Sequence, residues 1–501
     1  MSSIKTRAMS GAITGLIQNG VGIITQLILV PIVLKLAGQE TMGAYAVLLQ
    51  LIGYVLLLDF GFAVAYQRFL AQTYNPESGS NQFAVVFRVG KLFLYFVNLL
   101  MCLVLIAATL FLNLLLQTDQ SILTEARLAI LLQAIWIVLR TPLYVYGPAL
   151  LAVQKMTVVN LVAIPINCFR LLLSVAFIYA DLGLAGLVLA SIVSEATGYS
   201  AQRRIFLTKH RKLLFVESNK VDWQQFLIIF KFGKSYWGVN LSNTLLFGSD
   251  NIIASALFGA ASASVYYTTK MIGSLCITIL SRAVDNVYSG LTYISAQDDL
   301  LRLKAIYLQL LRYVASATAA VSSAVILFTD WSVNAWVGSQ QYAGDQMAIA
   351  ISILVFLQTV SHLNGIFALA IGKIDNWNTI SLLSGLLSTS LSVFLGILLG
   401  MKYMLFGICI GIVPTSLFLL FRITSSLKIT LNEIYYSTKN SLFFAIILIF
   451  FAVIKTHILY SLMHFLTLLL LYFFCCAGYI WFFVLKGNER VNLAQSLKIK
   501  I

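Results

Sequence analysis

The chain consists of long apolar stretches separated by short polar connections over nearly its whole length. An apolar run of about 20 residues crosses a bilayer as a helix, whereas membrane β-strands alternate in polarity over about 10 residues. The runs here have the helical length, so the pattern predicts an all-α polytopic membrane protein with about 14 transmembrane helices. The expected helices are 10–37, 42–66, 89–116, 125–150, 156–179, 183–201, 235–258, 262–289, 307–329, 346–371, 377–400, 403–421, 438–455 and 460–485.

The connection between the sixth and seventh expected helices is long and basic, and it divides the chain into two halves. Sliding the second half onto the first by 221 residues pairs Asn19 with Asn240, Ile32 with Ile253, Leu36 with Leu257, Gly38 with Gly259 and Tyr45 with Tyr266. A six-helix repeat is parallel, which predicts two six-helix lobes around a central cavity plus two C-terminal helices. The expected domains are an N-terminal lobe at 1–201, a basic cytoplasmic linker at 202–234, a C-terminal lobe at 235–422, and helices 13 and 14 with a cytoplasmic tail at 423–501.

Charge is scarce but unevenly placed. The chain is 60% hydrophobic and 10% charged, with a formal net charge of +15. In a membrane protein such an excess follows from the positive-inside rule, so it does not indicate nucleic-acid binding. With the N-terminus inside, the basic loops and both ends fall on one side, and the other side holds Arg127, Lys402 and Lys455. We therefore expect both termini in the cytoplasm, and a retained first helix in place of a cleaved signal peptide.

The sequence gives no sign of an enzyme. It contains no phosphate-binding Gly-Lys loop and no cluster of residues with metal-ligand spacing, and its six cysteines lie inside apolar runs. The longest outer loop, 330–345, is too short to carry a catalytic domain. The pattern favours a transporter without a cofactor, with H⁺ or Na⁺ as the candidate coupling ion.

Arginines lie near the middle of two expected helices. A charged side chain at this depth is costly, so it faces protein or water and is by default a functional hypothesis. Arg140 in the fourth helix and Arg170 in the fifth each share a helix face with polar residues. Two interpretations stay open for both arginines. They line a transport cavity and bind an anion, or they belong to structural ion pairs.

Polar residues also mark the first, seventh and eighth expected helices. Asn240, Asn243 and Asp250 follow one face of the seventh helix, and Gln18 lies on a polar face of the first. Lys270, in the eighth, either pairs with Asp250 across a short loop or faces the cavity with it. In the second case Asp250 is a candidate carrier of the coupling ion.

Asp59 interrupts the apolar run "VLLLDFGFAVAYQRFL" before the second helix reaches water. We expect it to face a cytoplasmic vestibule and to pair with an arginine, either Arg68 or one of the buried ones. Arg282 and Asp285 are three residues apart, the spacing of an intrahelical ion pair. Asp59, Asp250, Arg282 and Asp285 are thus the candidate coupling or ion-pair residues.

The first 70 residues resemble a known family. The turn at Ala37 and Gly38, the following Gly43 and Tyr45, and "LLDFG" at 57–61 are similar to the start of the polysaccharide-export flippases, the group of the O-antigen flippase Wzx. That group belongs to the superfamily of multidrug/oligosaccharidyl-lipid/polysaccharide exporters (the MOP superfamily), which also contains the MATE extruders and the lipid II flippase MurJ.

The resemblance implies a flippase of the bacterial inner membrane. It would move undecaprenyl-diphosphate-linked oligosaccharides, such as O-antigen units for lipopolysaccharide biosynthesis, to the outer leaflet by alternating access. Its partners would be this glycan lipid, membrane lipids and other polysaccharide-assembly proteins. Arg140, Arg170 and Lys270 would bind the diphosphate, and Asn240, Asn243 and Gln18 would line the same substrate cavity. The alternatives are a multidrug/cation antiporter of the same fold, whose cavity would be acidic, and a membrane glycan polymerase or ligase.

Overall fold

The chain folds almost entirely into helices in a computed structural model, which describes residues 2–74, 81–214, 223–373, 375–441, 462–485 and Glu489. No strand occurs among these residues, and ten of their helices are long and apolar enough to cross a membrane. The predicted all-α, multi-pass membrane fold is therefore confirmed. Parts of some expected features lie outside the described residues, namely 215–222 of the linker, 442–461 of the thirteenth and fourteenth helices, and 486–488 and 490–501 of the tail.

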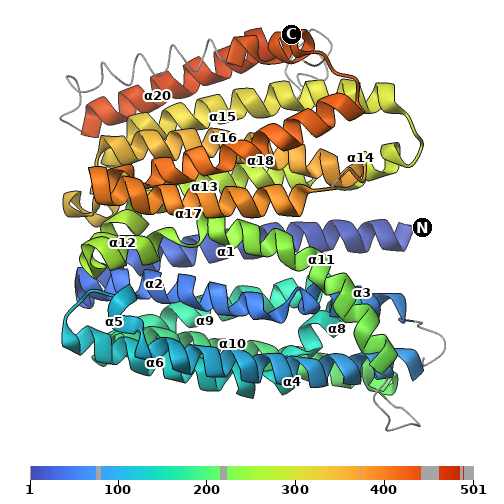
Figure 1. The fold of residues 1–501 in the computed structure, drawn as a ribbon, viewed down its shortest axis with the longest axis vertical. Coiled ribbons are helices and arrows are strands. Elements are labelled where there is room, and N and C mark those ends of the chain that lie inside the picture. Colours follow the sequence, from blue (N-terminus) through green and yellow to red (C-terminus); the bar gives the residue numbers. More distant parts are fainter. Residues whose placement is uncertain are drawn as a thin grey trace. The chain divides into compact units, whose positions relative to one another are not determined.

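The expected helices coincide with observed ones along most of the chain (Figure 1). Several expected spans are divided by breaks, and others extend beyond their apolar part. The expected linker, for example, is helical over 202–210 and 223–234. Two compact units form, Met1–Tyr267 and Thr268–Ile501, with the division inside α13 (Ala260–Asp285). The expected lobe boundaries stay predictions.

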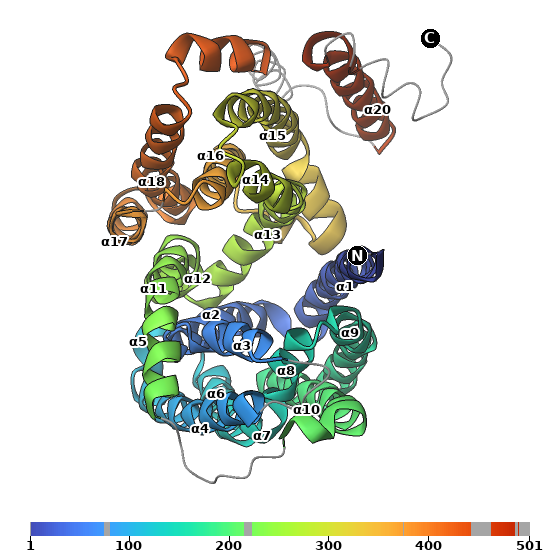
Figure 2. The same cartoon turned by 90° about the vertical axis from the view of Figure 1, so that its right-hand side faces the viewer.

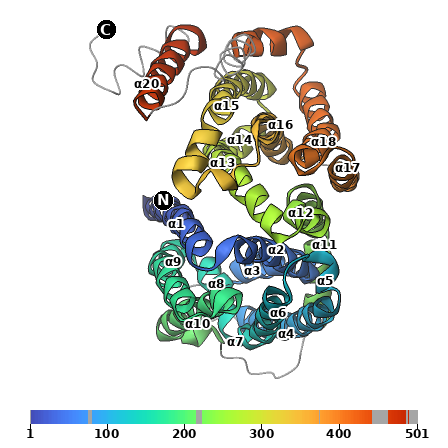
Figure 3. The same ribbon diagram turned by 90° about the vertical axis from the view of Figure 1, so that its left-hand side faces the viewer.

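Six long helices of the first unit form a closed bundle. α1 contacts α2 and α9, α9 contacts α10, α10 contacts α6, α6 contacts α4, and α4 contacts α2. Figures 2 and 3 look along these helices from opposite ends. The bounds are α1 (Ser2–Leu36), α2 (Gly38–Leu56), α4 (Asn81–Leu110), α6 (Gln120–Leu139), α9 (Met156–Tyr179) and α10 (Gly183–His210). The long helix α11 (Trp223–Phe247) packs outside this ring of six. Shorter elements complete the unit: η1 (Leu57–Asp59), α3 (Phe62–Gln72), α5 (Leu112–Leu115), α7 (Thr141–Tyr144), α8 (Tyr146–Ala152), η2 (Arg211–Leu214) and α12 (Asp250–Phe258).

A break in the second span explains why Asp59 is tolerated. Phe60 and Gly61 adopt left-handed conformations, with φ of 50° and 72°, so the chain leaves η1 and starts α3 in a new direction. The Gly61 N–H donates to Asp59 Oδ1 at 2.8 Å. The carboxylate thereby satisfies a backbone donor that the start of a helix leaves open. Within the described residues Asp59 forms no ion pair with an arginine, so its contact is a backbone cap.

The expected seventh helix, observed as α11 and α12, contacts the expected second helix along its length. α11 packs on α3 and α12 packs on α2. Trp237 Nε1 donates to the Leu57 carbonyl at 2.7 Å, and the Tyr54 hydroxyl hydrogen-bonds with Ser249 Oγ at the break between α11 and α12. Gln50 donates to Asp250 Oδ1 at 2.7 Å and accepts from the N–H groups of residues 251 and 252. α11 and α12 therefore belong structurally to the first unit.

Two glycines that the 221-residue offset pairs have the same backbone conformation. Gly38, at the start of α2, has φ of 88°, and Gly259, just before α13, has φ of 87°. These positive values are ones that residues with a Cβ rarely adopt. The two helices also meet closely, because a Cβ on Gly43 would lie 1.7 Å from the carbonyl oxygen of Ala260. The expected six-helix repeat itself stays a prediction.

The second unit is built on packed pairs of long helices. α15 packs on α16, α16 on α18, and α17 on α18. Small residues permit the close contact between α17 and α18. A Cβ on Gly407 would lie 2.3 Å from Ser392, and a Cβ on Gly411 would lie 2.4 Å from Ser388. The bounds are α14 (Tyr288–Ser295), α15 (Leu300–Val337), η3 (Ser339–Gln341), α16 (Asp345–Ala370), α17 (Trp377–Leu399), η4 (Met401–Tyr403), α18 (Met404–Ser426), α20 (Leu462–Tyr479) and the π-helical η6 (Ile480–Val484).

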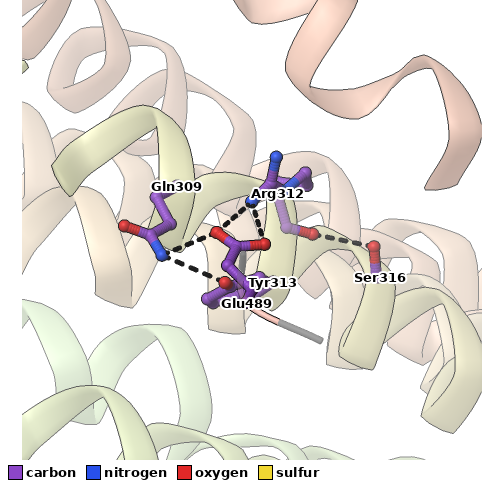
Figure 4. A network of polar contacts seen from close by, with 5 residues as sticks. All are labelled: Gln309, Arg312, Tyr313, Ser316 and Glu489. Carbon is purple, nitrogen blue, oxygen red and sulfur yellow. Dashed lines mark hydrogen bonds and ion pairs between the residues drawn. The ribbon is translucent and has the colours of Figure 1, made fainter. Parts of the chain in front are cut away.

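A polar network joins Glu489 to α15 inside this unit (Figure 4). Arg312 Nη2 donates to both carboxylate oxygens of Glu489, at 2.8 and 3.0 Å. Gln309 Nε2 donates to the same carboxylate at 2.9 Å and to the Tyr313 hydroxyl at 3.0 Å. The side chains of Arg312 and Glu489 are 14% and 21% exposed, so the pair is largely shielded from solvent.

Candidate functional site

A cavity of about 190 Å³ lies inside the first unit beside Arg170, between α1, α2, α9 and the start of α13. We call it the Arg170 cavity. Arg170 is the sole charged residue among its ten described lining residues. They are Thr25, Gln26, Leu29, Val30, Met42, Tyr45, Leu49, Arg170, Leu171 and Tyr267. The cavity is therefore cationic, with hydroxyl and amide groups beside the guanidinium.

Arg170 projects from the middle of α9, five residues after Pro165. In the described part of the chain its guanidinium forms no ion pair with a carboxylate. Gln26 Nε2 donates to the Tyr267 hydroxyl at 2.7 Å, which holds two of the polar lining groups together. An arginine at mid-membrane depth without a carboxylate has positive charge and hydrogen-bond donors to offer to an anion.

A second cavity, of about 610 Å³, lies along the other part of α2. We call it the Asp59 cavity. Asp59 is the sole charged residue among the described residues around it, and α11 forms the facing wall. The lining consists of Leu49, Gln50, Gly53, Leu56, Leu57, Asp59, Asn240, Asn243, Thr244, Phe247 and Gly248.

One face of α2 borders both cavities. Met42, Tyr45, Leu49, Gly53 and Leu56 are spaced by three or four residues, so they form one stripe on the helix. Leu49 lines both cavities. The two cavities are therefore neighbours along a single helix face, and their lining charges have opposite signs.

Arg140 has a different environment from Arg170. It lies at the break between α6 and α7, where its Nη1 is 3.8 Å from Glu195 Oε2 and its guanidinium lies over the Tyr144 ring at 5.4 Å. Trp136 Nε1 donates to the same carboxylate oxygen at 2.8 Å. The geometry is that of an ion pair between α6 and α10. The lining of neither cavity includes Arg140, so its expected role in substrate binding stays a prediction.

The other residues that the sequence singled out do not all line one cavity. Asn240 and Asn243 meet Asp59 in one cavity, whereas Gln18 lies half-buried on α1 outside the lining of both. Asp250 is 1% exposed and bonded to Gln50, and the half-buried Lys270 lies in the second unit. Their expected roles as substrate or coupling residues stay predictions.

Arg282 and Asp285 form the expected pair on α13, with Nη1 and Oδ2 3.7 Å apart. Asp285 Oδ1 also lies 2.7 Å from Nε2 of His362 on α16. The sequence predicted the first contact from the three-residue spacing. It did not predict the second, which joins helices far apart along the chain. Among the described residues no cluster of metal-ligating groups occurs.

Several cavity residues were not predicted from the sequence as site residues. Gln26, Tyr45 and Tyr267 accompany Arg170, and Gln50 and Phe247 line the Asp59 cavity. One signal for them was available. The stripe on α2 that contains Tyr45 and Leu49 has helical spacing, and it runs toward Asp59.

No family model and no curated protein sequence matches this chain. Solved structures do. The inward-facing form of a multidrug resistance MATE family transporter of the MOP superfamily has a TM-score of 0.71 at 15% identity, covering 84% of this chain and 99% of that one. The lipid II flippase MurJ, in an inward closed conformation, has a TM-score of 0.71 at 14% identity, covering 97% of this chain and 100% of that one.

A third similar structure is a MOP superfamily transporter from Pyrococcus furiosus, for which a reversed polarity of the binding pocket suggests a different function. Its TM-score is 0.60 at 14% identity, covering 85% of this chain and 97% of that one. At these identities the likeness concerns the fold alone. The chain has the fold that MATE transporters and MurJ share, which confirms the resemblance to this superfamily at the level of fold.

Proposed function

We propose that this protein is a flippase of the bacterial inner membrane that moves an undecaprenyl-diphosphate-linked oligosaccharide from the cytoplasmic to the outer leaflet. The observation that carries the proposal is the Arg170 cavity, whose lining combines a mid-membrane arginine with phenol, amide and hydroxyl groups and contains no described acidic residue. A diphosphate entering the membrane loses its hydration, and a guanidinium replaces it with charge-assisted hydrogen bonds.

The remaining parts of such a substrate suit the rest of the fold. The polyprenyl chain stays in lipid, because apolar side chains cover the membrane-facing surfaces of the helices. Alternating access, by rocking of one helix bundle against another, exposes the bound head group to each side in turn. The distribution of Lys and Arg supports a cytoplasmic location of both termini. H⁺ or Na⁺ is the proposed coupling ion.

A multidrug/cation antiporter is the second candidate, because the Asp59 cavity supplies a carboxylate that a cationic drug needs. The two candidates differ in the residue on which binding depends. A flippase for a diphosphate lipid depends on Arg170. A cation antiporter depends on Asp59 and gains nothing from an arginine in the neighbouring cavity.

The test is the affinity of the purified full-length protein, in phosphatidylcholine nanodiscs, for undecaprenyl diphosphate. Arg170→Ala is expected to weaken binding at least about tenfold, because a hydrogen bond to a charged group contributes about 1.5–3 kcal/mol. Arg170→Lys should retain part of the affinity, since it keeps the charge without the planar donors. Translocation of the lipid in proteoliposomes should fall in the same order.

Arg302→Ala is the matched control, since Arg302 is exposed in the first turn of α15. It should bind the lipid as the unchanged protein does. Equal affinity in Arg170→Ala and Arg302→Ala would contradict the proposal. Tight binding of ethidium that Asp59→Asn removes, without binding of the diphosphate lipid, would identify the antiporter.

A further inference from the structure

Two side-chain amides in the lining of the Asp59 cavity have no hydrogen-bond partner among the described residues. Asn240 and Asn243 line it from one face of α11, and neither side-chain amide forms a hydrogen bond within the described residues. Gln50 also lines it, but both ends of its amide are engaged with α12. An amide that loses its water without gaining a partner is costly, so these groups are solvated by water or bonded to a ligand.

The size and composition of the cavity point to a polyhydroxylated ligand. Its volume of about 610 Å³ falls in the range of about 300–1,000 Å³ typical of sites for organic ligands, and it is far larger than one ion needs. Amide groups both donate and accept, as sugar hydroxyls do, and the carboxylate of Asp59 accepts. Phe247 and Leu56 add apolar surface against which a sugar ring can pack.

The charges argue against two other occupants. Asp59 repels a diphosphate, which the neighbouring Arg170 cavity attracts. A metal cation would need several oxygen ligands, yet Asp59 is the sole described acidic residue in the lining and its Oδ1 already accepts from Gly61. The buried Asp250 is bonded to Gln50 and does not line the cavity.

We propose that the Asp59 cavity is the glycan subsite of the substrate whose diphosphate occupies the Arg170 cavity, with Asn240 and Asn243 as the residues that hydrogen-bond the sugar. This inference rests on the proposed function. Leu49 separates the two cavities on one face of α2, and Tyr45 and Gly53 are eight residues apart, or about 12 Å along a helix. A head group lying along this face presents its anionic part at one end and its sugar at the other.

The experiment compares two probes, undecaprenyl diphosphate and undecaprenyl diphosphate carrying one N-acetylglucosamine, on the full-length protein in phosphatidylcholine nanodiscs. The unchanged protein is expected to bind the sugar-bearing lipid more tightly. The double variant Asn240→Leu/Asn243→Leu should lose about tenfold in affinity for the sugar-bearing lipid, at about 0.5–1.5 kcal/mol per hydrogen bond. Its affinity for the sugar-free lipid should not change.

Asn243→Gln keeps an amide in the cavity and should retain most of the preference for the sugar, which separates the proposal from a loss of folding. Equal loss for both probes in the leucine variant, or no loss for either, would overturn the subsite. Loss of Na⁺-dependent thermal stabilisation in Asp59→Asn, with the sugar preference unchanged, would also overturn it.

A different result would contradict the proposed function. If neither the variants nor the unchanged protein bound the sugar-free lipid, the proposed function would fail. Amide-dependent binding of free N-acetylglucosamine would then still support a sugar site.

Discussion

Replacing Gly43 with alanine is expected to destabilise the protein by about 3 kcal/mol, the upper end of the usual cost of overpacking, and to reduce the yield of folded protein. The added Cβ would lie 1.7 Å from the carbonyl oxygen of Ala260 and 3.1 Å from the backbone nitrogen of Ser264. Both are backbone atoms of α13, so no side-chain rotation relieves the overlap, and the two helices must separate. Thermal unfolding of the detergent-purified protein measures the effect.

Gly53→Ala is the matched control, because Gly53 lies on the same helix with no atom within 4 Å of an added Cβ. Alanine there should raise stability by about 0.5–1 kcal/mol, since glycine in a helix interior costs that much. The prediction for Gly43 fails if both alanine variants unfold at the same temperature.

Removing one partner of the Arg312–Glu489 pair should have an effect of similar size. Arg312→Ala is expected to cost about 3–5 kcal/mol, because it leaves a largely buried carboxylate without its counter-charge. The substitution removes both hydrogen bonds from Arg312 to the Glu489 carboxylate, while the bond from Gln309 stays. A lower unfolding temperature and faster proteolysis of the C-terminal segment are the expected results.

A double substitution separates the pair's interaction from the cost of the orphaned charge. Arg312→Leu combined with Glu489→Leu should be more stable than either single variant, because both charges leave together. Arg302→Ala, on the exposed side of the same helix, should unfold as the unchanged protein does. A double variant as unstable as the sum of the two single ones would show that the side chains act independently.

The hydrophobic pattern predicted the helices well because length and apolarity are what a bilayer selects. It did not predict where they break. Phe60 and Gly61 bend the second span, and Arg140 lies at a break in the fourth, yet both places lie inside runs that are apolar overall. Two local sequence signals mark these breaks: a Gly after "LLDF" and a Thr-Pro after Arg140. They indicate a break through the backbone conformations that Gly and Pro favour, which a hydropathy pattern does not record.

The sequence predicted which polar residues lie on the same face of one helix. Asn240 and Asn243 share a face of α11 and do line one cavity together with Asp59. Contacts between helices were not predictable, because spacing along the chain does not indicate them. Arg140 meets Glu195, and Arg312 meets Glu489, across 55 and 177 positions of sequence. Contacts of this kind distinguish the two arginines, because Arg140 lies beside Glu195 whereas Arg170 lines a cavity.

The attachment of α11 and α12 to α2 and α3 affects how the protein is made. A ribosome delivers the first six spans before residues 223–267, yet the compact unit ends at Tyr267. Until then Gln50, Tyr54 and the Leu57 carbonyl have no acceptors or donors from the later helices. Translation of residues 223–267 takes several seconds, at about 5–20 residues per second. During this time the insertion machinery must keep the polar face of α2 away from lipid.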